Sequence, residues 1–112
     1  MPSRDWRLRI QDILECIEKI ERYTAGMAYK EFAADDKTLD AVLRNFTIIG
    51  EAARNVPDAI CERFPHIPWD KMRGIRNVVV HEYFGVSLEM IWETVRTDLP
   101  PLVHPLQQIL GT

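Results

Sequence analysis

The chain has 112 residues, of which 46% are hydrophobic and 28% are charged, the composition of an ordinary soluble globular protein. A chain of this length buries roughly two-thirds of the surface that it exposes when unfolded, which supports one core but not a large enclosed active site. We therefore expect a single domain over residues 1–112. The apolar run Val78–Val80 is far too short to cross a membrane, and the first five residues carry no signal-peptide core. These features predict a cytoplasmic protein without a membrane span.

The cysteines and histidines lack the spacing that metal sites use. Cys16 and Cys61 lie 45 residues apart, inside apolar helical patterns. The histidines His66, His81 and His104 are scattered, and no two of them fall three or four residues apart on one helix. We therefore expect buried free thiols, no bound metal and no other cofactor.

The net charge of −3 argues against a protein that coats nucleic acid indiscriminately. The distribution of charge is more informative than the total. Residues 71–83 hold three basic residues and one acidic residue, so a single basic region stands on an otherwise acidic chain. Such a pattern suits a focused anionic ligand.

The first predicted helix has a one-sided apolar stripe. Ser3 is the expected N-cap, and the helix should continue for about 20 residues to Tyr23. Residues 24–36 are expected to form a connection with one short helical turn. The stripe follows alternating steps of four and three residues, through Trp6, Ile10, Ile13, Ile17 and Ile20.

A second helix is predicted over 39–56, with Thr38 as its cap. Gly50 interrupts it at a cost of up to about 1 kcal/mol relative to alanine, which indicates that something packs closely there. No segment alternates with period two for long enough to form a strand, so the predicted fold class is all-α, an antiparallel bundle of four or five helices. The later elements are expected to be a short helix and a tight turn over 57–68, a third helix from Trp69 toward His81, a stop and new cap at 85–87, a last helix over 88–99, and a tail broken or kinked by Pro100, Pro101 and Pro105.

Four polar side chains of the third helix are expected to share one half of its surface. Asn77, His81 and Tyr83 fall at about 100°, 140° and −20° from Arg76 on a helical wheel. A guanidinium, an imidazole and a phenol together can bind a phosphate, move a proton and offer a hydroxyl.

The residues alone nevertheless favour a purely structural role for this group. A histidine near a helix end often serves as a dipole-stabilising cation, and Arg76 has Glu82 and Glu51 as possible partners. Glu51 is expected to be a buried partner of Arg76, with a solvent-exposed position only slightly less favoured.

A family resemblance shifts this balance toward function. Arg76, His81 and Tyr83 match the Arg-x4-His-x-Tyr signature, and the chain resembles the HepT-like (DUF86) toxins of the HEPN superfamily. The proline-rich tail departs from the family pattern. The other similar segments extend over nearly the whole chain: Arg7–Leu14, Ile49–Ala52, Phe64–Trp69, Trp92 and Asp98–Pro100.

The resemblance implies a single HEPN-like domain that acts as a metal-independent endoribonuclease, the toxin of a toxin–antitoxin pair. It also implies a homodimer, and as antitoxin a minimal nucleotidyltransferase of the MntA type. In the resembling toxins this partner transfers AMP from ATP to the tyrosine of the motif, which here is Tyr83. The alternative is a non-catalytic HEPN module that binds a nucleotide or a partner protein beside a nucleotidyltransferase.

The same resemblance assigns roles to the residues around the signature. His81 would accept the 2′-hydroxyl proton of RNA or return a proton to the leaving 5′-oxygen. Arg76 would hold the scissile phosphate and stabilise its charge in the transition state. Asn77 would orient a phosphate or Arg76, while Lys71 and Arg73 would guide the RNA backbone.

Overall fold

The computed structural model describes the backbone of residues 5–82 and 88–111, and the side chains of residues 5–79 and 88–111. Within these ranges the chain forms helices and turns and no β-strand, which confirms the predicted all-α bundle. None of these helices combines the length and hydropathy needed to cross a bilayer. The elements in chain order are α1 (Trp6–Thr24), α2 (Tyr29–Ala33), α3 (Asp36–Arg54), α4 (Asp58–Arg63), α5 (Trp69–Glu82), α6 (Leu88–Glu93), the π-helical segment η1 (Thr94–Asp98), the 3-10 turn η2 (Pro100–Leu102) and α7 (Val103–Ile109).

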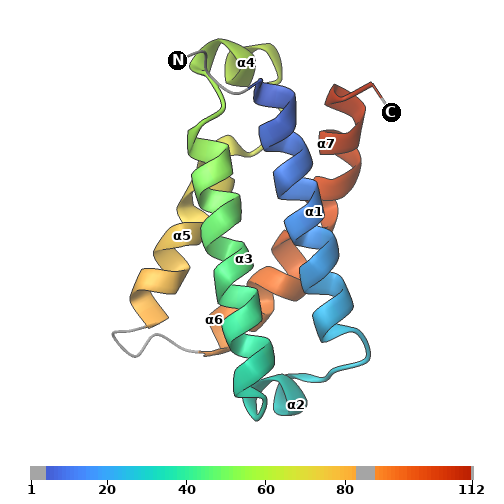
Figure 1. Cartoon of the computed structure of the whole chain (residues 1–112), viewed down its shortest axis with the longest axis vertical. Coiled ribbons are helices and arrows are strands. Elements are labelled where there is room, and N and C mark those ends of the chain that lie inside the picture. Colours follow the sequence, from blue (N-terminus) through green and yellow to red (C-terminus); the bar gives the residue numbers. More distant parts are fainter. Residues whose placement is uncertain (1–4, 83–87, 112) are drawn as a thin grey trace.

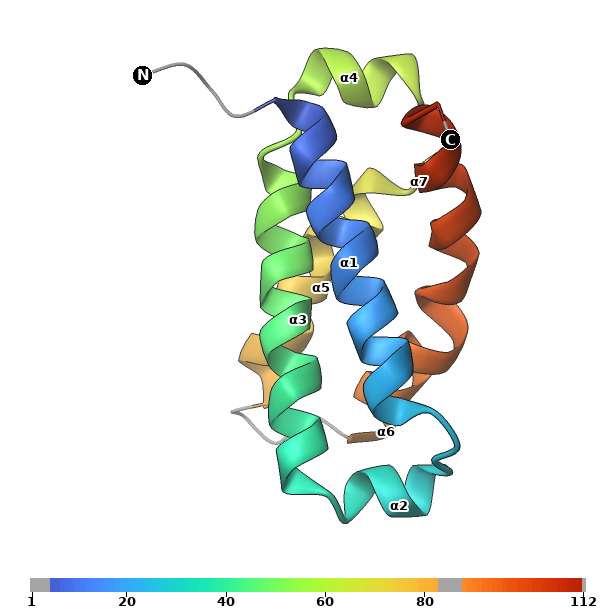
Figure 2. The ribbon, with the colours of Figure 1, turned by 45° about the vertical axis from the view of Figure 1, so that its right-hand side comes forward.

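The long helices α1 and α3 lie side by side and run in opposite directions, with α5 packed against α3 (Figure 1). The C-terminal segment from α6 to α7 runs along the other side of α1, as Figure 2 shows. The short helices α2 and α4 close opposite ends of the bundle. Helix α3 therefore lies between α1 and α5 and keeps one face toward solvent.

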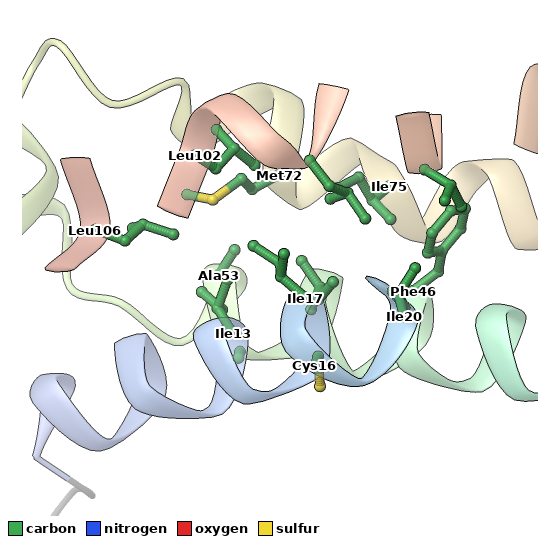
Figure 3. Close-up of a cluster of buried hydrophobic side chains, with 14 of the residues drawn as sticks. Ile13, Cys16, Ile17, Ile20, Phe46, Ala53, Met72, Ile75, Leu102 and Leu106 are labelled. Carbon is green, nitrogen blue, oxygen red and sulfur yellow. The ribbon is translucent and has the colours of Figure 1, made fainter. Parts of the chain in front are cut away.

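The core fills the space between these helices with aliphatic side chains. Figure 3 shows Ile13 and Ile17 of α1 pointing toward Met72 of α5 and Leu102 of η2. Burying an isoleucine of this kind contributes about 1.5–3 kcal/mol relative to leaving it exposed. The predicted stripe of α1 is confirmed, since four of its members are fully buried: Ile10, Ile13, Ile17 and Ile20.

The N-caps of the two long helices differ from those predicted. Helix α1 is capped by Asp5, whose carboxylate accepts a 2.9 Å hydrogen bond from the backbone N–H of Arg7, so the prediction of Ser3 was wrong. Helix α3 is capped by Asp35, which accepts from the N–H of Thr38 at 3.0 Å and from its hydroxyl at 2.9 Å. The predicted cap Thr38 thus lies inside the first turn. In both cases an aspartate directly before the first helical residue reaches the free N–H groups.

The C-terminal segment changes helix type instead of ending at its prolines. After α6 the chain widens into a π-helical segment, in which the N–H of Leu99 donates to the carbonyl of Thr94 at 3.0 Å. Pro100 and Pro101 then occupy the 3-10 turn. Pro105 lies in the first turn of α7, where a missing backbone N–H costs little. The tail, expected to be broken or kinked at its prolines, changes helix type there and continues as α7. The α-helical part of the last predicted helix, over 88–99, ends at Glu93.

Candidate functional site

Helix α5 packs closely against α3 where Arg76 crosses Gly50. A Cβ built on Gly50 would lie 2.8 Å from the Cβ of Arg76 and 3.2 Å from its backbone nitrogen. The close packing predicted from this glycine is thus confirmed, and the neighbour is the backbone of α5. The contact fixes the base of the Arg76 side chain beside the next residue of α3, Glu51.

Arg76 and Glu51 form an ion pair at the surface. The guanidinium Nη1 lies 2.9 Å from the carboxylate Oε1, and the side chains of Arg76 and Glu51 are 45% and 49% exposed. The pairing expected for Glu51 is confirmed, but the buried position placed first was wrong, since the carboxylate lies at the surface. A pair so open to solvent contributes roughly 0–1 kcal/mol to stability, so its main effect is on orientation. The guanidinium has five N–H donors, and Glu51 leaves several of them available to an anion.

Arg73, expected to guide RNA, makes several contacts inside the protein. Its Nε donates to the carbonyl oxygen of Ala53 at 3.3 Å, and its Nη2 donates to that of Val56 at 3.4 Å. The same Nη2 lies 3.2 Å from the Sγ of Cys61 and 3.7 Å from a carboxylate oxygen of Asp58. Arg73 therefore joins α5 to the C-terminal end of α3. No sequence pattern indicates this role, because it depends on contacts between residues far apart in the chain.

The other two predicted RNA-binding residues lie on different sides of α5. The Nζ of Lys71 pairs with Oδ1 of Asp98 at 3.2 Å, and both residues line a hollow of about 260 Å³ between α5 and the C-terminal segment. Asn77 is exposed and lines a separate hollow of about 380 Å³ together with Arg54 and Arg73. Arg73 thus shares this hollow with Asn77 and another, of about 610 Å³, with Lys71, while Asn77 and Lys71 line no hollow in common among those of the described residues.

His81 and Tyr83 complete the predicted set. His81 lies in the last turn of α5, five residues after Arg76 and about 7.5 Å further along the helix axis. Its side chain is outside the described part of the protein, and Tyr83 lies wholly outside the described residues. The structure thus places Arg76 and the backbone of His81 on one continuous helix, as the sequence predicted.

Two exposed arginines of α3 stand beside this site and were missed by the sequence analysis. Arg44 lines a hollow of about 400 Å³ that Val79 of α5 also borders, and Arg54 borders the hollow of Asn77. Among the described residues, no carboxylate lies within ion-pair distance of either guanidinium. Arg44 lies seven residues before Glu51 and Arg54 three residues after it, and residues so spaced share one side of a helix. This spacing could have placed both arginines beside Glu51 from the sequence.

Comparison with known proteins identifies the family. The model of the family described as "Ribonuclease HepT-like" matches residues 13–109. A probable ribonuclease HepT of Thermococcus cleftensis is 42% identical over 100 residues, which are 89% of this chain and 91% of the relative. A protein of Methanocaldococcus jannaschii named "Putative RNase" is 36% identical over 110 residues, covering 98% of this chain and 91% of the relative. No solved structure matches the chain. The chain belongs to the HepT-like ribonuclease family.

Proposed function

We propose that the protein is a metal-independent endoribonuclease that acts as the toxin of a toxin–antitoxin pair. The observation that carries the proposal is the position of Arg76. Its guanidinium is half exposed, held on one side by Glu51, and placed five residues before His81 on the same helix of a HepT-like ribonuclease. A phosphate that approaches Arg76 therefore comes near a residue able to transfer protons close to neutral pH.

The proposed reaction needs one proton carrier and one cation. His81 removes the proton of an RNA 2′-hydroxyl, and the 2′-oxygen attacks the adjacent phosphorus. The bond from phosphorus to the 5′-oxygen breaks, and that oxygen receives a proton from His81, which leaves a cyclic phosphate on the first fragment. Arg76 stabilises the charge that develops on the phosphate oxygens.

The neighbouring polar residues bind the RNA backbone in this proposal. Asn77 is exposed and directly follows Arg76, so its amide orients a phosphate or the guanidinium. Arg73 borders the same hollow as Asn77 and is 26% exposed, which leaves part of its guanidinium open to RNA. Lys71 is 57% exposed and guides the strand on the side of α5 that faces the C-terminal segment.

The partner in this proposal is a nucleotidyltransferase antitoxin of the MntA type. It inactivates the toxin by transferring AMP to Tyr83. The tyrosine oxygen attacks the α-phosphorus of ATP, pyrophosphate leaves, and the hydroxyl proton is released. The toxin itself acts as a homodimer in which two faces bearing Arg76 and His81 share one cleft, because a small bundle offers little concavity of its own.

Cleavage of RNA by the purified protein in excess EDTA tests the activity. We expect the wild type to cut, and Arg76→Ala and His81→Ala to lose at least about 100-fold in rate, the usual contribution of an acid–base group or of a charge-stabilising donor. Arg22→Ala is the matched control, because Arg22 is an exposed arginine of α1 already paired with Glu18 at 3.4 Å. It should cut like the wild type.

Expression without the antitoxin gives a second readout. The wild type should slow growth, and Arg76→Ala and His81→Ala should not. Cleavage that requires a divalent metal, or that survives His81→Ala, would contradict the mechanism. A wild-type protein that binds RNA or nucleotide without cutting would instead identify a non-catalytic binding module.

A further inference from the structure

The solvent face of α3 carries opposite charges on either side of an apolar residue. Arg44 and Glu51 are seven residues apart, which places them about 10 Å apart along the axis and within about 20° around it. Ile48 lies between them and is 36% exposed. A hollow of about 500 Å³ adjoins this row, and its lining includes Ile48, Arg44 and the exposed Tyr23 of α1.

The row formed by Arg44, Ile48 and Glu51 has a charge pattern that is complementary to a second copy of itself. If two copies of α3 cross in opposite directions at Ile48, a two-fold axis places Arg44 of each copy opposite Glu51 of the other. The exposed Ile48 side chains then meet at the centre of the contact and lose their exposure to water. Arg44 is the suitable cation, because among the described residues it pairs with no carboxylate of its own chain.

We propose that Arg44 of a second copy of the chain binds Glu51 and becomes part of the Arg76 site. The contact itself does not depend on the proposed function; only the binding of an RNA phosphate at the completed site rests on it. Within one chain Arg76 and Glu51 cancel each other's charge. A carboxylate accepts several hydrogen bonds, so Glu51 can hold both guanidiniums at once. The second copy thus gives each site the net positive charge that an anionic RNA phosphate requires, in a chain whose total charge is −3.

The contact also explains how two sites come to face one cleft. Each Glu51 lies about 5 Å along α3 from the crossing point, and packed helices lie about 8–10 Å apart. The two Arg76 residues are therefore held on opposite sides of the same narrow contact. Each site is incomplete without the arginine of the other copy.

Charge reversal with light scattering or sedimentation tests the contact without any RNA. We expect a wild-type dimer, and a rise in its dissociation constant of at least about tenfold in Arg44→Glu and in Glu51→Arg, because each single change places like charges opposite each other. The double variant Arg44→Glu/Glu51→Arg should dimerise again. Lys37→Glu is the matched control, since Lys37 is an exposed cation of the first turn of α3, away from the crossing point, and it should leave the dimer unchanged.

Mixing the Arg44→Glu and Glu51→Arg variants gives the decisive test of the contact. A mixed dimer restores both opposite-charge pairs, so Arg44→Glu and Glu51→Arg should associate with each other although neither associates with itself. Circular dichroism establishes that each variant is folded. A monomeric wild type at 100-fold the concentration of the cleavage assay, a dimer insensitive to Arg44→Glu, or folded single variants that do not associate when mixed would each overturn the proposal. None of these outcomes depends on RNA cleavage, so failure of the contact and failure of the ribonuclease proposal are separate results.

Discussion

Gly50 and Arg76 hold α3 and α5 in register, because Arg76 occupies the space that a Cβ on Gly50 would need. The buried Gly50 lacks a Cβ, and the position that a Cβ would take lies 2.8 Å from the Cβ of Arg76. Real Cβ atoms almost never approach so closely, so no other residue fits without displacing α5. The same contact sets Arg76 next to Glu51, and the geometry of the candidate site therefore depends on a glycine that carries no chemistry.

Gly50→Ala should destabilise the protein. Alanine favours a helix by about 1 kcal/mol, but the displaced α5 costs about 1–3 kcal/mol through repacking of the core. Urea denaturation should therefore show a net loss in the free energy of unfolding. Gly74→Ala is the control, because a Cβ on Gly74 meets nothing within 4 Å, and it should stabilise the protein by up to about 1 kcal/mol. A Gly50→Ala protein as stable as Gly74→Ala would show that α5 is not fixed by this contact.

Arg73→Ala should reduce stability more than a surface substitution does. It removes the hydrogen bonds to the carbonyls of Ala53 and Val56, and charged hydrogen bonds of this kind contribute about 1–3 kcal/mol together. Lys71→Ala removes an exposed ion pair with Asp98 and should cost less than about 1 kcal/mol. Chemical denaturation of both variants measures the difference. Equal losses would mean that Arg73 does not anchor α3 to α5.

Arg73→Lys separates this structural role from RNA guidance. Lysine keeps the charge but cannot reach two carbonyls at once, so it should lose most of the stability that Arg73→Ala loses. If Arg73 also guides RNA, Arg73→Lys should bind RNA nearly as well as the wild type while Arg73→Ala binds more weakly. Fluorescence anisotropy with a labelled RNA, at a temperature where all variants are folded, provides the comparison.

Cys16 should make stability fall at alkaline pH. Burial raises the pKa of its thiol from 9.0 to about 11. Below pH 9 the thiol is protonated in the folded and the unfolded protein, so its full stabilisation is present. Between pH 9 and 11 ionisation occurs mainly in the unfolded state, which favours unfolding. A difference of two pKa units corresponds to about 2–3 kcal/mol.

The measurement compares the wild type with Cys16→Ala across this range. Other groups titrate in both proteins, so the difference between the two slopes isolates Cys16. The wild type should lose about 2 kcal/mol more than Cys16→Ala between pH 9 and pH 11. Parallel slopes would show that the native thiol ionises as readily as the unfolded one. Iodoacetamide should also leave Cys16 of the native protein unmodified near neutral pH, since only the thiolate reacts.

Local patterns predicted the long helices and the close packing at Gly50. The apolar stripe from Ile10 to Ile20 repeats often enough that periodicity alone located α1 and its buried face. The valines Val78–Val80 continue α5 as expected. Gly50 predicted a close neighbour, because a glycine inside a helix lowers its stability relative to alanine. Each of these features depends on residues that are near in sequence.

The features that were not predicted depend on exact helix ends and on contacts between helices, which local sequence patterns do not determine. Ser3 was the predicted cap of α1, and only the structure shows that Asp5 stands directly before the first helical residue. The contacts of Arg73 with α3 were not predicted, because its hydrogen bond to Ala53 joins residues 20 positions apart. Arg44 was not predicted as a site residue, because a lone arginine on a helix is usually solvated. Only the structure shows that Arg44 and Glu51 lie on the same solvent-exposed face of α3.

Tyr83 provides the test of control by the antitoxin. In the proposed function its hydroxyl receives AMP, and the added phosphate charge then repels the RNA backbone and competes for Arg76. Tyr83 comes two residues after His81 in the chain and directly follows Glu82, the last residue of α5. Inhibition of this kind needs no change of fold.

Co-expression with the nucleotidyltransferase followed by intact-mass measurement checks this prediction. The wild type should gain the mass of one or more AMP groups and lose its ribonuclease activity. Tyr83→Phe should gain none and stay toxic, because phenylalanine keeps the ring and lacks the attacking oxygen. Tyr29→Phe is the matched control, since Tyr29 lies in α2 at one end of the bundle, and it should be modified like the wild type. A mass increase that persists in Tyr83→Phe, or neutralisation of that variant by the partner, would place the modification on another residue and remove Tyr83 from the mechanism of control.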